Sequence, residues 1–274
     1  RRLQKKEGAP VLLVADNLQI TDPAIAAALA ARDPRPVCEL VQRCAAAGAQ
    51  AIDVNSGPLT HDPQAQMTFL VEAVRSATDL PLLIDTANPA AMEAGLRAAG
   101  PGTIINGFSL EPAKLARILP LARAYDADII GFLLTPGSHV PQDAAERLGL
   151  AVDLLQSCQA AGIAPQRLII DPVVVPLAWQ DGNRQAREML TSLRQLPEVL
   201  GFPVRTIAGL SNLTTGRGYR RQRLLLEQTY LPMLAAAGLD MVLMNVLHSE
   251  TVAVGCACRL LTSGGVFTWE EVRW

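Results

Sequence analysis

The sequence predicts a single (β/α)₈ barrel, and three observations support this α/β fold class. Short apolar runs rich in β-branched residues recur eight times, and stretches rich in Ala, Leu, Glu and Arg with helical spacing separate them. Strands that alternate with helices favour a parallel sheet of repeated βαβ units, and eight such strands close a barrel. The chain has 274 residues, and one barrel of this kind requires roughly 250. We therefore expect one domain over residues 1–274, with an extended N-terminal tail at residues 1–10.

Each predicted strand is a short apolar run, and most of these runs end in a polar residue. In chain order, the strands are expected at residues 11–16, 51–55, 82–85, 103–106, 129–134, 168–171, 205–210 and 241–245. Apolar residues at helical spacing predict helices between them, for example at residues 36–47, 68–77, 89–99 and 146–161. The longest irregular segments follow the fifth, sixth and seventh strands, which is where a barrel builds its active site.

An open, doubly wound sheet is the main structural alternative. That fold commonly places a Gly-x-Gly-x-x-Gly motif after its first strand, and this sequence has no such motif there. The sequence also shows no linker, low-complexity tract or break in composition. We therefore favour the closed barrel.

Composition and charge argue against several classes of function. The formal net charge is −2, which gives no general attraction to nucleic acid or to an anionic membrane. No uncharged apolar run approaches the roughly 18 residues that span a bilayer, and we see no signal peptide. The five cysteines are odd in number and irregular in spacing, as in a cytoplasmic protein with reduced thiols. The three histidines are isolated from one another, so we expect no metal site.

Polar side chains stand at or just beyond the end of nearly every predicted strand. They are Asp16, Asp53, Asn55, Asp85, Asn106, Asp171, Asn212 and Asn245. Because the C-terminal ends of barrel strands meet at one mouth, we expect these side chains to converge. Any single one of them is also explained as a helix cap or a turn residue. Taken together, carboxylates and amides suit a flat heterocycle with an exocyclic NH₂ and ring N–H groups, such as a pterin.

The distribution of lysine argues against a common barrel chemistry. The lysines are Lys5, Lys6 and Lys114, and none of them stands at the end of a predicted strand. A Schiff-base aldolase requires a lysine nucleophile inside the barrel. A serine hydrolase is also unsupported, because the chain has no Gly-x-Ser-x-Gly motif.

Several short motifs, taken in order, resemble those of a known family. They are RDPRPV at 32–37, GAQAIDVNSGP at 48–58, LLIDTANPAAMEAGL at 82–96, IIN at 104–106, LIIDPVVVP at 168–176, GLSNLT at 209–214 and AAGLDMVLMN at 236–245. From about residue 11 to residue 263, the chain resembles the methyltetrahydrofolate:corrinoid protein methyltransferases. It is also similar to the folate module of cobalamin-dependent methionine synthase.

This resemblance implies both a fold and a reaction. The fold is a pterin-binding, dihydropteroate synthase-like (β/α)₈ barrel, usually found as a homodimer. The reaction moves the N5 methyl group of methyltetrahydrofolate, or of a related tetrahydropterin, to the Co(I) of a corrinoid. A separate corrinoid-binding protein supplies that cobalamin or related corrinoid, and the barrel binds no metal of its own.

The resemblance also implies roles for individual residues. The pterin ring is expected to contact Asp53, Asn55, Asp85, Asn106, Asp171, Ser211 and Asn212. Among these, Asn212 would be the catalytic residue, because it would hydrogen-bond N5 of the folate. Arg223, together with Arg220, would contact the glutamate tail of the folate.

The chain departs from the family pattern at two places. The first strand reads Ala15-Asp16-Asn17-Leu18-Gln19 where the family has Gly-Glu-Arg-x-Asn, so the arginine is lost. The loop after the seventh strand carries Asn-Leu-Thr-Thr in place of Asn-x-Ser-Gln, and it gains the arginines 217, 220, 221 and 223. A solvated start of a helix explains these arginines as well as a tail-binding or partner-docking role does.

Two other functions remain open at this point. A dihydropteroate synthase-type condensing enzyme resembles the chain at the Ile-Asp-Thr and Ile-Asp-Pro strands, but that family carries lysines that are missing here. A non-catalytic pterin-binding subunit of a corrinoid complex is the second alternative, since the altered first strand leaves room for it.

Overall fold

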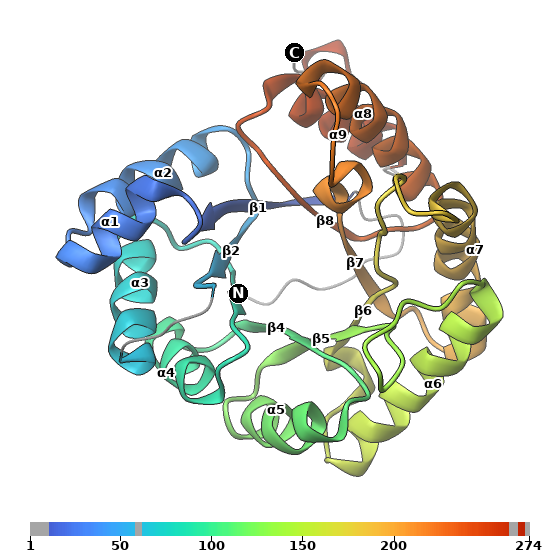
Figure 1. The fold of residues 1–274 in the computed structure, drawn as a ribbon, viewed down its shortest axis with the longest axis horizontal. Coiled ribbons are helices and arrows are strands. Elements are labelled where there is room, and N and C mark those ends of the chain that lie inside the picture. Colours follow the sequence, from blue (N-terminus) through green and yellow to red (C-terminus); the bar gives the residue numbers. More distant parts are fainter. Residues whose placement is uncertain (1–10, 58–61, 263–267, 272–274) are drawn as a thin grey trace.

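The computed structural model describes residues 11–57, 62–262 and 268–271. These residues form a closed barrel of eight parallel strands, with helices arranged in a ring around it (Figure 1). The predicted fold class is therefore confirmed. The extended tail expected at residues 1–10 lies outside the described residues.

The strands follow one another around the barrel in chain order, and β1 closes the ring by pairing with β8. Their bounds are β1 (Leu12–Gln19), β2 (Ala51–Asn55), β3 (Leu82–Asp85), β4 (Ile104–Phe108), β5 (Asp128–Phe132), β6 (Leu168–Asp171), β7 (Arg205–Gly209) and β8 (Met241–Met244). The bounds predicted for β2, β3 and β6 are confirmed. The largest difference is at β1, which continues to Gln19 where the sequence predicted an end at residue 16.

The extra length of β1 and β4 has one physical cause. The register of β1 against β2 shifts between Ala15 and Leu18, and that of β4 against β5 shifts between Asn106 and Phe108. Such irregularities let a strand continue beyond its first polar residue, and they are common beside active sites. The apolar run therefore stops before the backbone pairing does.

The helices of the described residues lie on the outside of the barrel (Figure 1). Their bounds are α1 (Pro23–Ala31), α2 (Arg35–Ala46), α3 (Pro63–Ala77), α4 (Pro89–Ala99), α5 (Pro112–Ala124), α6 (Ala144–Ala160), α7 (Gly182–Leu200), α8 (Arg220–Ala236) and α9 (Ser249–Thr262). Helix α3 begins before residue 68, the predicted start, because the Asp62 carboxylate caps it and Pro63 occupies its first turn. Short 3₁₀ helices are η1 (Pro165–Arg167), η2 (Leu210–Thr214) and η3 (Trp269–Glu271). No helix in the described ranges is long and apolar enough to cross a bilayer.

A layer of apolar side chains fills the interior of the barrel, with one residue from each strand. The layer consists of Val14, Ala51, Leu83, Ile104, Ile130, Ile169, Ile207 and Met241. A second, larger core lies between the barrel and its helices. Because the interior is packed rather than hollow, a ligand has room only above this layer, at the mouth formed by the strand ends.

Candidate active site

The mouth residues point into the barrel because of their spacing from the interior layer. Side chains alternate between the two faces of a strand. Asp53, Asp85, Asn106 and Asp171 each follow an interior residue of the same strand by two positions, and Asp16 follows Val14 in the same way. These five side chains therefore face one mouth, and their roles in binding stay predictions.

Two amide–carboxylate pairs form one side of this mouth. The amide nitrogen of Asn106 on β4 donates to Asp53 on β2, at 3.0 Å. The amide nitrogen of Asn55 on β2 donates to Asp85 on β3, at 2.6 Å. Asn55, Asp85 and Asn106 also occupy neighbouring positions in the strand register. We refer to the group Asp53, Asn55, Asp85 and Asn106, together with Asp171, as the cup.

Burial makes the carboxyls of this group hold their protons more tightly. It raises the pKa of Asp85 to about 6. It raises the pKa of Asp53 well above its usual range, and the neighbouring Asp85 carboxylate adds to that effect, whereas the hydrogen bond from Asn106 lowers it. Two carboxyls so close together do not ionise independently. Near neutral pH, this side of the cup can therefore offer both acceptors and a donor to a ring.

Asp171 completes the cup from β6. Its side chain is buried, and it accepts a hydrogen bond from the backbone of Val173 at 2.8 Å. Burial raises the Asp171 pKa to about 7, and the Val173 N–H and the Arg147 guanidinium oppose this rise. Arg147 is itself fully buried on α6, where it donates to Gln185 and to the carbonyl of Pro141. A cation behind Asp171 favours the ionised form that a ring N–H needs as its acceptor.

Asn212 lies over the end of β7. It belongs to η2 and is exposed, and its amide nitrogen is 2.9 Å from the position of a Cβ atom on Gly209. Gly209 follows the interior residue Ile207 by two positions, so it stands where the other strands carry a side chain into the mouth. The Asn212 amide therefore occupies the space that the missing Gly209 side chain leaves.

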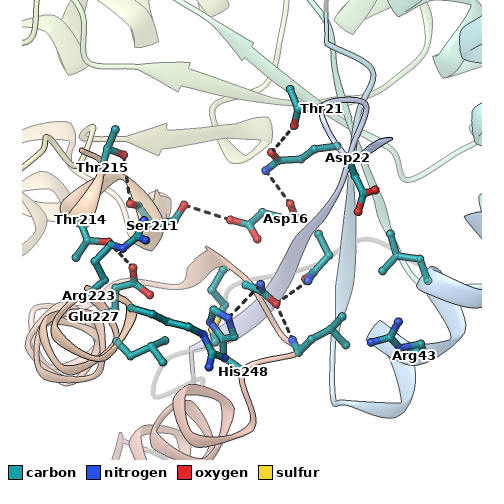
Figure 2. Close-up of a pocket in the computed structure, with 18 of the residues that line it drawn as sticks. Asp16, Thr21, Asp22, Arg43, Ser211, Thr214, Thr215, Arg223, Glu227 and His248 are labelled. Atoms are coloured by element: carbon teal, nitrogen blue, oxygen red, sulfur yellow. Dashed lines mark hydrogen bonds between the residues drawn. The ribbon is translucent and has the colours of Figure 1, made fainter. Parts of the chain in front are cut away.

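A cavity of about 930 Å³ opens beside the cup, between β1, α2, η2, α8 and the segment after β8 (Figure 2). Ser211, Arg220 and Arg223, which the sequence singled out, contribute to its lining, and so do Asp16, Arg43, Glu227 and His248. The residues of the cup and Asn212 are not part of this lining. The cavity is therefore a lateral extension of the mouth rather than the cup itself.

Asn17 of β1 and Asn245, which directly follows β8, have a structural role. The amide of Asn17 donates to the Asn245 side chain at 2.6 Å, and its oxygen accepts from the backbone of Val246. Asn245 also accepts from the backbone of Leu247 and lies 3.4 Å from a ring nitrogen of His248. These contacts tie the segment after β8 to β1, so for Asn245 the turn-shaping explanation holds.

Residues 17–245 match the model of the pterin binding enzyme family. The chain belongs to the pterin-binding enzymes.

Curated relatives of this pterin-binding barrel agree with the resemblance found in the sequence. The chain is 23% identical over 239 residues to a methylcorrinoid:tetrahydrofolate methyltransferase of Eubacterium limosum, a match that covers 86% of this chain and 85% of that protein. It is 22% identical over 227 residues to a methionine synthase of Mycobacterium tuberculosis, a match that covers 80% of this chain but 19% of that longer protein. The second match therefore concerns one part of a larger enzyme.

Solved structures similar to this chain include dihydropteroate synthases. One from Stenotrophomonas maltophilia, with imidazole bound in its active site, has a TM-score of 0.71 and 18% identity, and the match covers 95% of this chain and 96% of that one. One from Yersinia pestis has a TM-score of 0.65 and 20% identity, and the match covers 94% and 96% of the two chains. At these identities, the similarity shows a shared fold.

The sequence did not identify three features of the pterin-binding barrel. Nothing in the sequence distinguishes Arg43 from other exposed arginines of a helix, and only the folded structure shows that it lines the cavity. Glu227 lies within α8, where it accepts a hydrogen bond from Thr214. Gly209 belongs to the Gly-Leu-Ser-Asn motif, but nothing in that motif predicts that the Asn212 side chain packs against Gly209. Among the described residues, no group of His, Cys, Asp or Glu side chains could hold a metal ion.

Proposed function

We propose that this pterin-binding barrel is a methyltransferase that moves the N5 methyl group of methyltetrahydrofolate, or of a related tetrahydropterin, to the Co(I) of a corrinoid. A separate corrinoid-binding protein carries that corrinoid, and the barrel acts as one domain over residues 1–274. The observation that carries the proposal is an uncharged amide, Asn212, at the edge of a cup of carboxylates. The similarity to the methylcorrinoid:tetrahydrofolate methyltransferase over most of the chain supports the same reaction.

The cup supplies the recognition of the ring. A pterin edge carries an NH₂ group and ring N–H groups, and the carboxylates of Asp85 and Asp171 accept their hydrogens. Hydrogen bonds to charged groups contribute roughly 1.5–3 kcal/mol each. The Asn55 amide orients the Asp85 carboxylate and the Val173 N–H orients that of Asp171 before the ring arrives, which lowers the entropy cost of binding.

The reaction requires N5 to become positively charged. A tertiary amine leaves poorly as an amide anion, so N5 must take up a proton as the methyl group departs. Asn212 accepts a hydrogen bond from N5 as it is protonated, and this contact is strongest in the transition state. The name of the Eubacterium limosum relative describes methyl transfer from corrinoid to tetrahydrofolate. The same contacts serve either direction, since both pass through one transition state.

The lateral cavity accommodates the tail of the folate. Arg220 and Arg223 of α8 and Arg43 of α2 line it. Figure 2 shows Arg223 and Arg43 on opposite sides of the cavity. Within the described residues, none of these three guanidinium groups forms an ion pair. They are therefore free to bind the carboxylates of a glutamate tail.

We also propose that the protein is a homodimer. Helix α8 exposes Leu225, Leu226 and Met233, with exposed fractions of 64%, 44% and 44%. Apolar side chains gathered on one outer helix are typical of a surface that another protein covers. Light scattering of the purified protein measures the mass and tests this directly.

Stopped-flow absorbance tests the proposed reaction. Chemically reduced cob(I)alamin is mixed with methyltetrahydrofolate and the protein, and the Co(I) absorption band is followed. A methyltransferase removes the band at a rate that rises with protein concentration, whereas a protein that only binds pterins leaves it intact. Incubation with a pterin pyrophosphate and aminobenzoate serves as the matched test for a condensing enzyme, and we expect no product.

A further inference from the structure

Methyl transfer needs a source for the proton that N5 acquires, and the carboxyls of the cup are already assigned to the polar edge of the ring. Asp53 accepts from Asn106, Asp85 accepts from Asn55, and Asp171 accepts from the backbone of Val173. All three lie outside the lining of the lateral cavity. Asp16 is the interior-facing carboxyl of β1, and it does line the cavity. It therefore combines a place at the mouth with access to solvent.

Asp16 is also linked to the loop that carries Asn212. Oδ2 of Asp16 accepts a hydrogen bond from the hydroxyl of Ser211 at 3.4 Å, and Figure 2 shows the two side chains pointing toward each other across the cavity. Ser211 directly precedes Asn212 in η2. The backbone N–H of Asp16 itself is a second donor to this carboxyl. The protonated carboxyl therefore keeps its place beside η2 and has one O–H to donate.

The charges around Asp16 come from every wall of the cavity. Acidic groups that face it or act on it are Glu227 on α8, Asp53 on β2 and Asp22 before α1. Cationic or titratable groups are Arg43 and Cys44 on α2, Arg220 and Arg223 on α8, and His248 after β8. Burial raises the pKa of Asp16 to about 6, the Ser211 hydroxyl lowers it, and the charge of Glu227 raises it further. A carboxyl with this pKa is close to the operating range of a general acid.

We propose that the carboxyl of Asp16 holds the proton that N5 of the tetrahydropterin receives when its methyl group leaves. This inference rests on the proposed methyl transfer and adds the acid that the reaction lacked. Ser211 and Glu227 act on Asp16 as positioning residues. In the reverse direction, the Asp16 carboxylate takes the proton back from N5.

The step balances in atoms and electrons. The bond between cobalt and the methyl carbon forms with the electron pair of Co(I), so the cobalt is oxidised to Co(III). The bond between the methyl carbon and N5 breaks, and its electron pair stays on nitrogen. That pair binds the proton from Asp16, which is left as a carboxylate. Water in the lateral cavity can then return a proton to Asp16.

Single-turnover methyl transfer to cob(I)alamin tests the inference, with saturating methyltetrahydrofolate so that titration of the cup does not limit binding. For the wild-type protein, the rate is expected to fall as the pH rises through the Asp16 pKa of about 6. The Asp16→Asn variant keeps the shape but holds no acidic proton. We expect it to lose about 100-fold in rate, to lose the fall with pH, and to bind methyltetrahydrofolate within about threefold of the wild-type dissociation constant.

Two further variants leave Asp16 in place and move its pKa in opposite directions. Ser211→Ala removes a hydrogen bond that lowers the pKa, so the fall in rate should move to higher pH. Glu227→Gln removes a charge that raises the pKa, so the fall should move to lower pH. Asp62→Asn is the control, because its side chain caps α3, lies outside the lining of the cavity and is not among the groups that shift Asp16. Its profile should coincide with that of the wild type.

The outcomes separate this inference from the proposed function. If the wild-type protein leaves the Co(I) band intact, both the methyltransferase proposal and the role of Asp16 are wrong. If the wild type transfers the methyl group and Asp16→Asn keeps both rate and pH profile, the role of Asp16 alone is wrong. That role is also wrong if Ser211→Ala and Glu227→Gln leave the pH profile at its wild-type position. A loss of folate binding in Asp16→Asn that matches its loss of rate would assign Asp16 to binding instead.

Discussion

The amide nitrogen of Asn212 lies 2.9 Å from the position that a Cβ atom on Gly209 would occupy. Contacts this short do not occur between a real Cβ atom and a nitrogen, so the absence of a side chain at 209 lets the amide fold back over the end of β7. The position of the amide thus depends on two residues, of which only one carries the functional group.

Gly209→Ala should impair methyl transfer without touching the reacting groups. The backbone φ of Gly209 is −84°, which alanine adopts without strain, so the fold and its melting temperature should be retained. The new methyl group displaces the Asn212 amide, and we expect the turnover number to fall by about tenfold or more, because small displacements of a positioned group are costly. Stopped-flow kinetics and circular dichroism measure the two quantities.

A double-variant cycle supplies the control for Gly209→Ala. If the methyl group acts only by displacing Asn212, then Gly209→Ala in an Asn212→Ala background should cause no further loss. Additive losses would show that Gly209 acts on some other part of the site.

Asn212→Ala should lower the turnover number more than it weakens folate binding. The amide interacts most strongly with N5 when N5 is protonated, which happens in the transition state rather than in the bound substrate. Loss of a hydrogen bond of this kind typically costs roughly 10²–10³ in rate. Single-turnover kinetics and titration calorimetry on the same preparation give the two losses. Asn212→Asp retains an acceptor oxygen and should lose less, and equal losses in rate and affinity for Asn212→Ala would refute the assignment.

Asp171→Asn should abolish pterin binding and, at the same time, stabilise the fold. Its amide no longer offers a charged acceptor to the ring, so calorimetric heats should disappear. The pKa of Asp171 rises from 3.8 to about 7 on folding. Between these values the folded protein holds more protons than the unfolded chain, so the free energy of unfolding of the wild type decreases as the pH rises through this window.

The stabilisation by Asp171→Asn should therefore depend on pH. The free energy of unfolding of the asparagine variant does not decrease in this way, because asparagine does not ionise. Its gain in melting temperature over the wild type should therefore be larger at about pH 8 than at about pH 5. Trading stability for a buried acceptor is common at binding sites. A gain that is equal at both pH values would show that Asp171 does not ionise on the way to neutral pH, and unchanged calorimetric heats would remove it from the site.

Binding of methyltetrahydrofolate should tighten as the pH rises through 6 to 7. Both Asp85, with a pKa of about 6, and Asp171, with a pKa of about 7, are protonated below this range and lose their charge. The ring N–H groups then face neutral carboxyls, whose hydrogen bonds are weaker. Fluorescence titrations at constant ionic strength measure the dissociation constant. Asp85→Asn should show a smaller change with pH than the wild type, and tighter binding at low pH would contradict a role for these carboxylates as acceptors.

The cup was predictable from the sequence because strand alternation is local. A polar residue two positions after an interior residue must face the mouth, as Asp85 does after Leu83. The contacts that decide how the site is built were not predictable, because they join distant segments. The Asn17–Asn245 pair spans 228 positions, and the Asp16–Ser211 pair spans 195. Strand ends such as that of β1 were misplaced for a related reason, since backbone pairing continues through a register shift that leaves no apolar pattern.

Arg223→Ala should weaken binding of methyltetrahydrofolate but not of a methylated tetrahydropterin that lacks the glutamate tail. The Arg223 guanidinium lines the lateral cavity. It forms no ion pair with any described residue, so its removal leaves no carboxylate without a partner. An exposed charge pair contributes on the order of 1 kcal/mol, so the dissociation constant for the folate should rise about fivefold, and the rise should shrink at high salt. Arg221→Ala is the matched control, because Arg221 lies in the first turn of the same helix but does not line the cavity. If both variants weaken folate binding equally, or if Arg223→Ala weakens the tail-free pterin as well, the arginines act through the general charge of the loop and the cavity does not hold the tail.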